Sequence, residues 1–140
     1  MALRFAGEVF SGIGKGKYYV GHPEYQKRFD RALGYKPYPG TLNVRLLDPG
    51  DRKEVGELRA RKGIRIDPFT FQGEGFSALT CFDGAMSGER VTVLLIDITH
   101  YNESVVELIS PVFLRGRFGL KDGDRVEFTV EPGDSTPGMR

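Results

Sequence analysis

Short alternations of apolar and polar residues, ended by glycine, proline, serine or aspartate, run along most of this chain. Alternation with a period of two is typical of strands that bury one face. We therefore expect strands at residues 5–10, 17–20, 41–46, 69–82, 90–99, 105–109 and 125–130. Val93-Leu94-Leu95-Ile96 is continuously apolar, which indicates a strand buried on both faces. Many short strands separated by turns predict a small β-barrel.

One segment has helical spacing instead. It starts at Pro23, which the first turn of a helix tolerates, and Gly34 ends it. Between them, apolar residues recur three or four positions apart, at Tyr25, Phe29, Ala32 and Leu33. A second, short helix is expected at residues 112–118, ended by Gly119. The predicted fold class is mainly β, with one main helix and a short second helix.

Two segments lack a strong apolar pattern. Residues 48–67 are dense in mixed charge, so we expect a surface excursion with weak strands near Val55 and Ile64, and we assign it no function. Residues 131–140 hold two prolines, two glycines and almost no apolar side chains, which predicts a disordered tail. Residues 1–130 are then expected to form a single domain, in keeping with a length of 140 residues.

Composition narrows the classes of protein that remain. The 20 Lys and Arg residues nearly balance the 19 Asp and Glu residues, so no broad field attracts nucleic acid or an anionic membrane. The single cysteine, Cys81, can form no internal disulfide, and its alternating surroundings predict a buried structural thiol. No stretch approaches the ~20 apolar residues of a membrane span, and no signal peptide is recognisable. We expect a soluble, cytoplasmic protein.

A glycine loop carries the first candidate chemistry. Gly12, Gly14 and Gly16 alternate with other residues, a spacing that fits neither the dinucleotide fingerprint nor the Walker loop. Glycines nevertheless let the backbone approach a ligand, and successive N–H groups can form an anion nest. With Lys15 and Lys17 to neutralise charge, the loop suits phosphates. The alternative is a flexible hairpin with solvated lysines.

The second candidate is the pair Thr41 and Asn43. At the start of a strand both side chains point to one face, while Leu42 points into the core. A hydroxyl and an amide carbonyl are hard, neutral oxygen donors that suit Mg²⁺. Without a carboxylate, such a site would take its metal together with the phosphates of a nucleotide. The alternative is a structural pair that satisfies backbone groups.

Further segments accompany these motifs in a set order. The loop Gly12-x-Gly14-x-Gly16-x-Tyr18-Tyr19 precedes the helix, and Gly40-Thr41-Leu42-Asn43 follows it. Later come Thr99-His100-Tyr101, Val106-Glu107-Leu108-Ile109-Ser110-Pro111 and Leu114-Arg115. In this order the chain resembles the archaeal CTP-dependent riboflavin kinase family over roughly residues 6–130. The two blocks at residues 40–43 and 107–111 are specific in combination.

The resemblance implies a small, closed, six-stranded barrel of the cradle-loop type. It also implies transfer of the γ-phosphate of CTP to the 5′-hydroxyl of riboflavin, giving FMN and CDP, with Mg²⁺ as the metal. We further expect a monomer, and the balanced charge predicts no nucleic-acid partner. By the same resemblance, Thr41 and Asn43 would bind the metal, and Thr99 and Glu107 the flavin. The nucleotide would contact Gly12, Ile13, Gly14, Lys15, Gly16, Lys17, Val112, Phe113, Leu114 and Arg115.

Two alternatives stay open at the level of the sequence. Glu107 interrupts the apolar strand 105–109, where either a ligand or exposure to solvent would relieve the cost of burying a carboxylate. It is also a candidate catalytic carboxylate. The turn at residues 119–126 resembles those of DNA-binding swapped-hairpin barrels, so a non-catalytic DNA-binding or regulatory module is the rival function.

Overall fold

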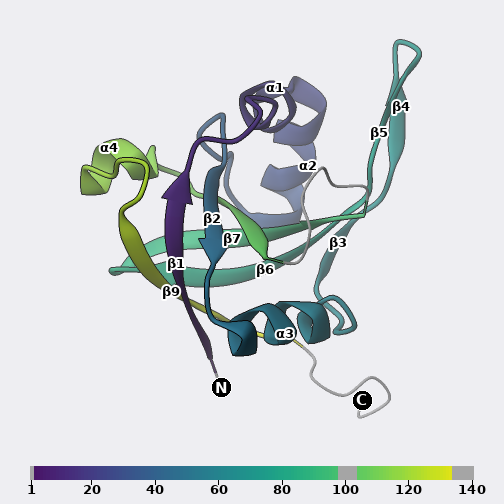
Figure 1. Cartoon of the computed structure of the whole chain (residues 1–140). Helices are drawn as coiled ribbons and strands as arrows, with labels where there is room; N and C mark the ends of the chain where they lie inside the picture. Colours follow the sequence, from purple (N-terminus) through teal and green to yellow (C-terminus); the bar gives the residue numbers. More distant parts are fainter. Residues whose placement is uncertain (1, 98–103, 134–140) are drawn as a thin grey trace.

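A closed antiparallel β-barrel forms the centre of the protein, seen here in a computed structural model that describes residues 2–97 and 104–133. The strands follow the order β3-β6-β7-β8-β2-β1-β9, and a further pairing of β6 with β9 closes a ring of six, with β3 outside it (Figure 1). The predicted six-stranded barrel is therefore confirmed. Its strands are β1 (Leu3–Phe10), β2 (Leu42–Leu46), β6 (Leu79–Met86), β7 (Glu89–Ile96), β8 (Val105–Ile109) and β9 (Arg125–Val130).

Two hydrophobic cores lie on opposite sides of the barrel wall. Along β7, Val91, Val93 and Leu95 pack in the interior core, whereas Leu94 belongs to a second core beneath the helices. This arrangement confirms the prediction of a strand buried on both faces. Cys81 on β6 lies in the second core and is fully buried, as predicted, and burial raises the pKa of its thiol to about 12.

The two predicted helices are present. Helix α2 (Pro23–Leu33) begins after His22, whose side chain accepts a hydrogen bond from the Glu24 backbone N–H at 3.1 Å. It ends at Gly34, which has the left-handed φ of 82° that favours glycine. Helix α4 (Leu114–Phe118) occupies part of the expected segment and ends at Gly119 in the same way.

Helix α1 (Gly16–Gly21) replaces a predicted strand at residues 17–20, so that prediction was wrong. Its aromatic and β-branched residues favour a strand when taken alone, but Val20 is the only one that is buried. The Tyr19 N–H bonds to the Lys15 carbonyl at 3.1 Å, and Val20 packs in the core of α2. Packing against a neighbouring helix thus overrides the local preference.

The charged excursion contains a second unpredicted helix, α3 (Pro49–Leu58), in place of the weak strand expected near Val55. Its start carries a recognisable signal, because Asp48 accepts a hydrogen bond from the Gly50 N–H at 2.7 Å and Pro49 follows it. Val55 and Leu58, three positions apart, are its buried residues. The weak strand near Ile64 is confirmed as β3 (Ile64–Ile66).

The stretch predicted as one long strand at residues 69–82 is divided. Strands β4 (Phe69–Phe71) and β5 (Glu74–Phe76) form a hairpin that projects beside α2, and β6 starts only at Leu79 (Figure 1). The turn between them holds Gln72 and Gly73, both with positive φ. The Tyr18 hydroxyl bonds to Glu74 at 2.8 Å, and the Arg28 guanidinium stacks on Phe69. The hairpin is thereby fastened to α1 and α2.

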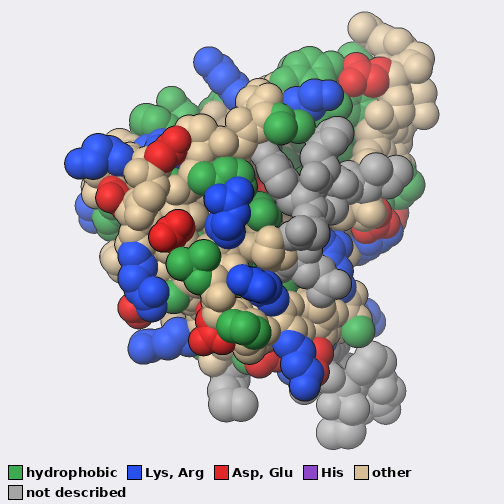
Figure 2. Space-filling view, in the orientation of Figure 1, with side chains coloured by type: hydrophobic (Ala, Val, Ile, Leu, Met, Phe, Trp, Pro, Cys, Tyr) green, Lys and Arg blue, Asp and Glu red, His purple; other side chains and the backbone are tan. Residues whose placement is uncertain are grey.

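Acidic and basic side chains are interspersed on the face shown in Figure 2, in keeping with the near-zero net charge. Among the described residues, no helix is long and apolar enough to cross a bilayer. The disorder predicted for residues 131–140 concerns mainly 134–140, which lie outside the described residues.

Candidate functional site

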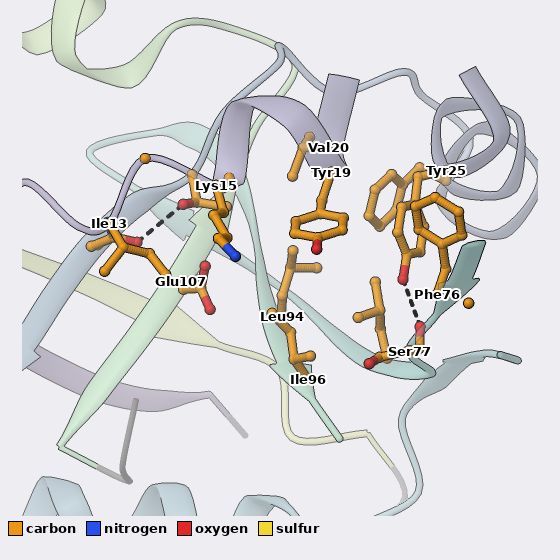
Figure 3. A pocket seen from close by; sticks show the side chains of 17 residues that line it. Ile13, Lys15, Tyr19, Val20, Tyr25, Phe76, Ser77, Leu94, Ile96 and Glu107 are labelled. Atoms are coloured by element: carbon orange, nitrogen blue, oxygen red, sulfur yellow. Dashed lines mark hydrogen bonds between the residues drawn. The ribbon is translucent and has the colours of Figure 1, made fainter. Parts of the chain in front are cut away.

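A cavity of about 200 Å³ lies on the outer side of the barrel wall, beneath α1 and α2 (Figure 3). One end of it is aromatic and aliphatic, lined by Tyr19, Val20, Tyr25, Phe29, Phe76, Leu79, Leu94 and Ile96. The other end is polar, lined by Thr41, Asn43, Glu107 and the glycine loop. Tyr25 closes the apolar end by donating a hydrogen bond to the Ser77 carbonyl at 2.6 Å. The lining suits a ligand with an apolar, aromatic part and a polar part.

Strand alternation brings the polar residues to this face. On β2, Leu42 and Val44 point into the barrel, and Asn43 between them lines the cavity. Strand β8 pairs with β2 so that Glu107 stands directly opposite Asn43. The apolar neighbours of Glu107 on β8, Val106 and Leu108, belong to the barrel interior. Glu107 can therefore be acidic within an apolar strand, because its side chain faces the cavity while its two neighbours face the barrel interior.

Glu107 is mostly shielded from solvent, which removes the alternative of a solvent-facing carboxylate. Burial raises the pKa of Glu107 above its ordinary value, and a hydrogen bond from the Thr41 hydroxyl opposes the rise. The Lys15 side chain extends over the same side of the cavity (Figure 3). Thr99, the other residue expected to contact flavin, lies outside the described residues.

Thr41 and Asn43 have the geometry of two adjacent metal ligands. Their side-chain oxygens, Thr41 Oγ1 and Asn43 Oδ1, are 3.0 Å apart. An octahedral cation with metal–oxygen distances of about 2.1 Å places neighbouring ligand oxygens about 3.0 Å apart, so the pair fits Mg²⁺. No group of three or more His, Cys, Asp and Glu side chains suited to a metal exists among the described residues.

The glycine loop packs directly on this pair. A Cβ added at Gly16 would lie 2.6 Å from Thr41 Oγ1, so only glycine allows the observed approach. Ile13, Gly14 and Lys15 line the cavity beside it.

Two other residues of the loop lie apart from the cavity. Lys17 sits on α1 and borders a separate open groove with Tyr18 and His22. Gly12 is not among the residues that line the cavity. The structure thus places the glycine loop next to Thr41 and Asn43. Of its two lysines, Lys15 lines the cavity and Lys17 borders the separate groove.

A second cavity, of about 80 Å³, adjoins the first. Val112, Phe113, Leu114 and Arg115 all line it, as does Thr41, which therefore borders both cavities. Arg115 is not a free cation, because it donates a hydrogen bond to Asp122 at 2.7 Å.

Residues that the sequence interpretation missed complete both cavities. Tyr38 stacks on Phe113 with ring centroids 4.9 Å apart, and both rings are about half exposed. Its position between Pro37 and Pro39 was the available signal, since an exposed aromatic in a rigid turn suits ligand stacking. The spacing of Tyr25 and Phe29 predicts that they lie on the buried face of a helix. The same spacing is expected whether that face packs in a core or lines a cavity.

These features define a class of protein: a small cradle-loop barrel with a ligand cavity against its outer wall and a glycine loop beside a pair of oxygen donors. The chain belongs to the CTP-dependent riboflavin kinase family. The family model of that name, described as "Domain of unknown function DUF120", matches residues 9–130.

Curated relatives include proteins named riboflavin kinase from three archaea. The one from Archaeoglobus fulgidus is 41% identical over 132 residues, covering 91% of this chain and 54% of that protein. The one from Halobacterium salinarum is 39% identical over 134 residues, covering 92% and 57%. The one from Aeropyrum pernix is 40% identical over 127 residues, covering 90% and 94%. This chain therefore spans a little over half the length of the first two relatives.

Proposed function

We propose that this chain is a riboflavin kinase that transfers the γ-phosphate of CTP to the 5′-hydroxyl of riboflavin, giving FMN and CDP. The observation that carries the proposal is the position of Thr41. It borders both the aromatic cavity and the smaller cavity at residues 112–115, and it touches the glycine loop at Gly16. A phosphoryl group transferred between ligands in the two cavities would therefore pass next to Thr41. Family membership supports the same reaction.

Each region then has a role in binding. The aromatic end of the larger cavity takes the flavin ring, and Glu107 with Thr99 contacts the rest of the flavin. Residues 12–17 hold the phosphates, and residues 112–115 complete the nucleotide pocket. Thr41 and Asn43 hold Mg²⁺, which the 3.0 Å separation of their oxygens supports. The proposal describes a monomer that acts without nucleic acid.

Catalysis of this reaction depends mainly on aligning the two substrates and on stabilising negative charge on the phosphate oxygens. Phosphoryl transfer passes through a loose transition state, so the nucleophile needs alignment more than activation. The N–H groups of the loop and the Lys15 ammonium stabilise charge on the transferred oxygens. Bound Mg²⁺ supplies further neutralisation of the phosphates. Glu107, at the polar end of the flavin cavity, accepts a hydrogen bond from the acceptor hydroxyl and can take up its proton.

The test is formation of FMN from riboflavin and Mg²⁺ with CTP or with ATP as the donor. We expect rapid turnover with CTP and little with ATP. Efficient use of ATP without a response to CTP would overturn the choice of donor. Salt-dependent DNA binding without flavin binding or phosphoryl transfer would instead favour the rival, non-catalytic barrel.

A further inference from the structure

The Thr41 hydroxyl has more acceptors than hydrogens. Thr41 Oγ1 lies 3.0 Å from Asn43 Oδ1, to which it can donate. The Glu107 carboxyl, which lines the same cavity and stands across the β-ladder from Asn43, is a second acceptor beside this hydroxyl. A threonine hydroxyl carries one hydrogen and two lone pairs, so it cannot satisfy both acceptors at once.

Metal binding would settle this competition. Thr41 Oγ1 and Asn43 Oδ1 would hold the proposed cation, and each oxygen would then have to direct a lone pair toward it. A hydrogen on the line between the two oxygens is incompatible with that arrangement. Glu107 is then the acceptor that remains for the Thr41 hydrogen.

We infer that Glu107 is a positioning residue for the metal site, accepting the Thr41 hydrogen so that the Thr41 oxygen faces the cation. The inference rests on the proposed function and extends it, because it gives Glu107 a task that does not involve flavin. The β-ladder holds Glu107 in place, since it is the direct partner of Asn43 across β2 and β8. Directly opposite side chains on one face stand about 5 Å apart.

The surroundings of Glu107 make the contact strong. The carboxyl is largely shielded from water, so Thr41 has few competitors for it. Asn43 beside it is only 9% exposed. Gly16 closes the other side of Thr41, because no side chain fits between them. Thr41 is thus held between a backbone on one side and an acceptor on the other, as a preorganised ligand requires.

The test measures the affinity for CTP by calorimetry with saturating Mg²⁺ and with EDTA, in the absence of riboflavin. The ratio of the two affinities is the enhancement by metal. We expect Glu107→Ala to reduce this enhancement by about 10- to 100-fold, as is usual when the partner of a metal ligand is lost. Glu107→Gln keeps a carbonyl acceptor and should keep most of the enhancement. If Glu107→Ala does not fold, Glu107→Met fills the volume without an acceptor and takes its place.

A double-mutant cycle separates this role from a general loss of binding. Thr41→Val removes the hydroxyl, and adding Glu107→Ala to it should cost almost nothing more, because the two residues act as a unit. Glu127→Ala removes an exposed charge on β9 and serves as the matched control. Folded Glu107→Ala with the wild-type enhancement would overturn the inference while leaving the kinase proposal intact. A wild-type protein that binds no CTP would overturn both.

Discussion

At the scale of single residues, glycines in the loop serve different purposes. Gly14 has a φ of 86°, a left-handed conformation that few other residues adopt, and no atom lies within 4 Å of its missing Cβ. Gly16 has an ordinary helical position, and its lack of a side chain makes room for Thr41. The sequence identified both motifs as candidates, but it could not reveal that they touch, because 25 positions separate Gly16 from Thr41.

Gly16→Ala tests this contact. Alanine is well suited to a helix, so the protein should fold, but its Cβ must displace the Thr41 hydroxyl. We expect turnover to fall by about 10- to 100-fold, because a small misplacement of a ligand disturbs phosphate geometry. The measurement is the initial rate of FMN formation against Mg²⁺ concentration, with circular dichroism to check folding.

Gly88→Ala is the control for that experiment. Gly88 lies in the turn between β6 and β7, and its φ of 82° makes alanine strained there without any steric neighbour. It should lower thermal stability and leave turnover unchanged. Wild-type turnover in Gly16→Ala would mean that Thr41 adapts, and that the close approach has no bearing on catalysis.

At the scale of elements, the strong periodic patterns gave correct strands and the correct main helix. The exceptions are the strand predicted at residues 69–82, which a turn at Gln72 and Gly73 divides, and two helices that were missed. The two missed helices have separate physical causes. Helix α1 has too few residues for a period to show, and its packing on α2 is invisible in its own six residues. Helix α3 was hidden by its charge density, although Asp48 and Pro49 form a standard start signal. The first error was unavoidable from one sequence, and the second was not.

Asp48→Ala tests the start of α3. Loss of the hydrogen bond to the Gly50 N–H should lower the free energy of unfolding by about 1 kcal/mol. Kinase activity should be unchanged, because α3 contributes no residue to either cavity. The measurement is chemical denaturation, with Asp48→Ser as the control that keeps a capping oxygen. Equal destabilisation by serine and alanine would show that the cap contributes nothing.

At the scale of the whole molecule, the cavity was the least predictable feature. Its walls come from the glycine loop, α1, α2, β2, β5, β6, β7 and β8, and only the closed barrel brings these segments together. The resemblance to a family supplied residue types for the site, but not the depth of Glu107 or the stacking of Tyr38 on Phe113. Those depend on packing between segments, which no local pattern encodes.

The burial of Glu107 also makes the stability of the whole fold depend on pH. Because burial raises its pKa above the ordinary 4.5, the folded state favours the protonated form. Its contribution to stability is fully present below pH 4.5 and is lost as the pH rises through the higher pKa of the folded state. Above pH 4.5, burial of this carboxyl therefore lowers the free energy of unfolding relative to a side chain that cannot ionise.

Glu107→Gln should consequently unfold at a higher temperature than the wild type near neutral pH, with the difference shrinking toward pH 4.5. Thermal unfolding followed by circular dichroism across this range checks the trend. Glu127→Gln changes an exposed side chain on β9 and should show no such divergence. A difference that is constant with pH would indicate that the amide alters packing and not charge.

The two-sided burial of β7 has a practical consequence for engineering. Its odd-numbered residues Val91, Val93 and Leu95 fill the barrel, while Leu94 and Ile96 form part of the cavity wall. Because neighbouring positions on one strand face opposite ways, the barrel can be repacked for heat resistance without changing any side chain that meets a ligand. Conversely, the cavity can be reshaped for an altered flavin by substitutions that leave the barrel filling untouched. A single strand thus offers two independent sets of positions for redesign.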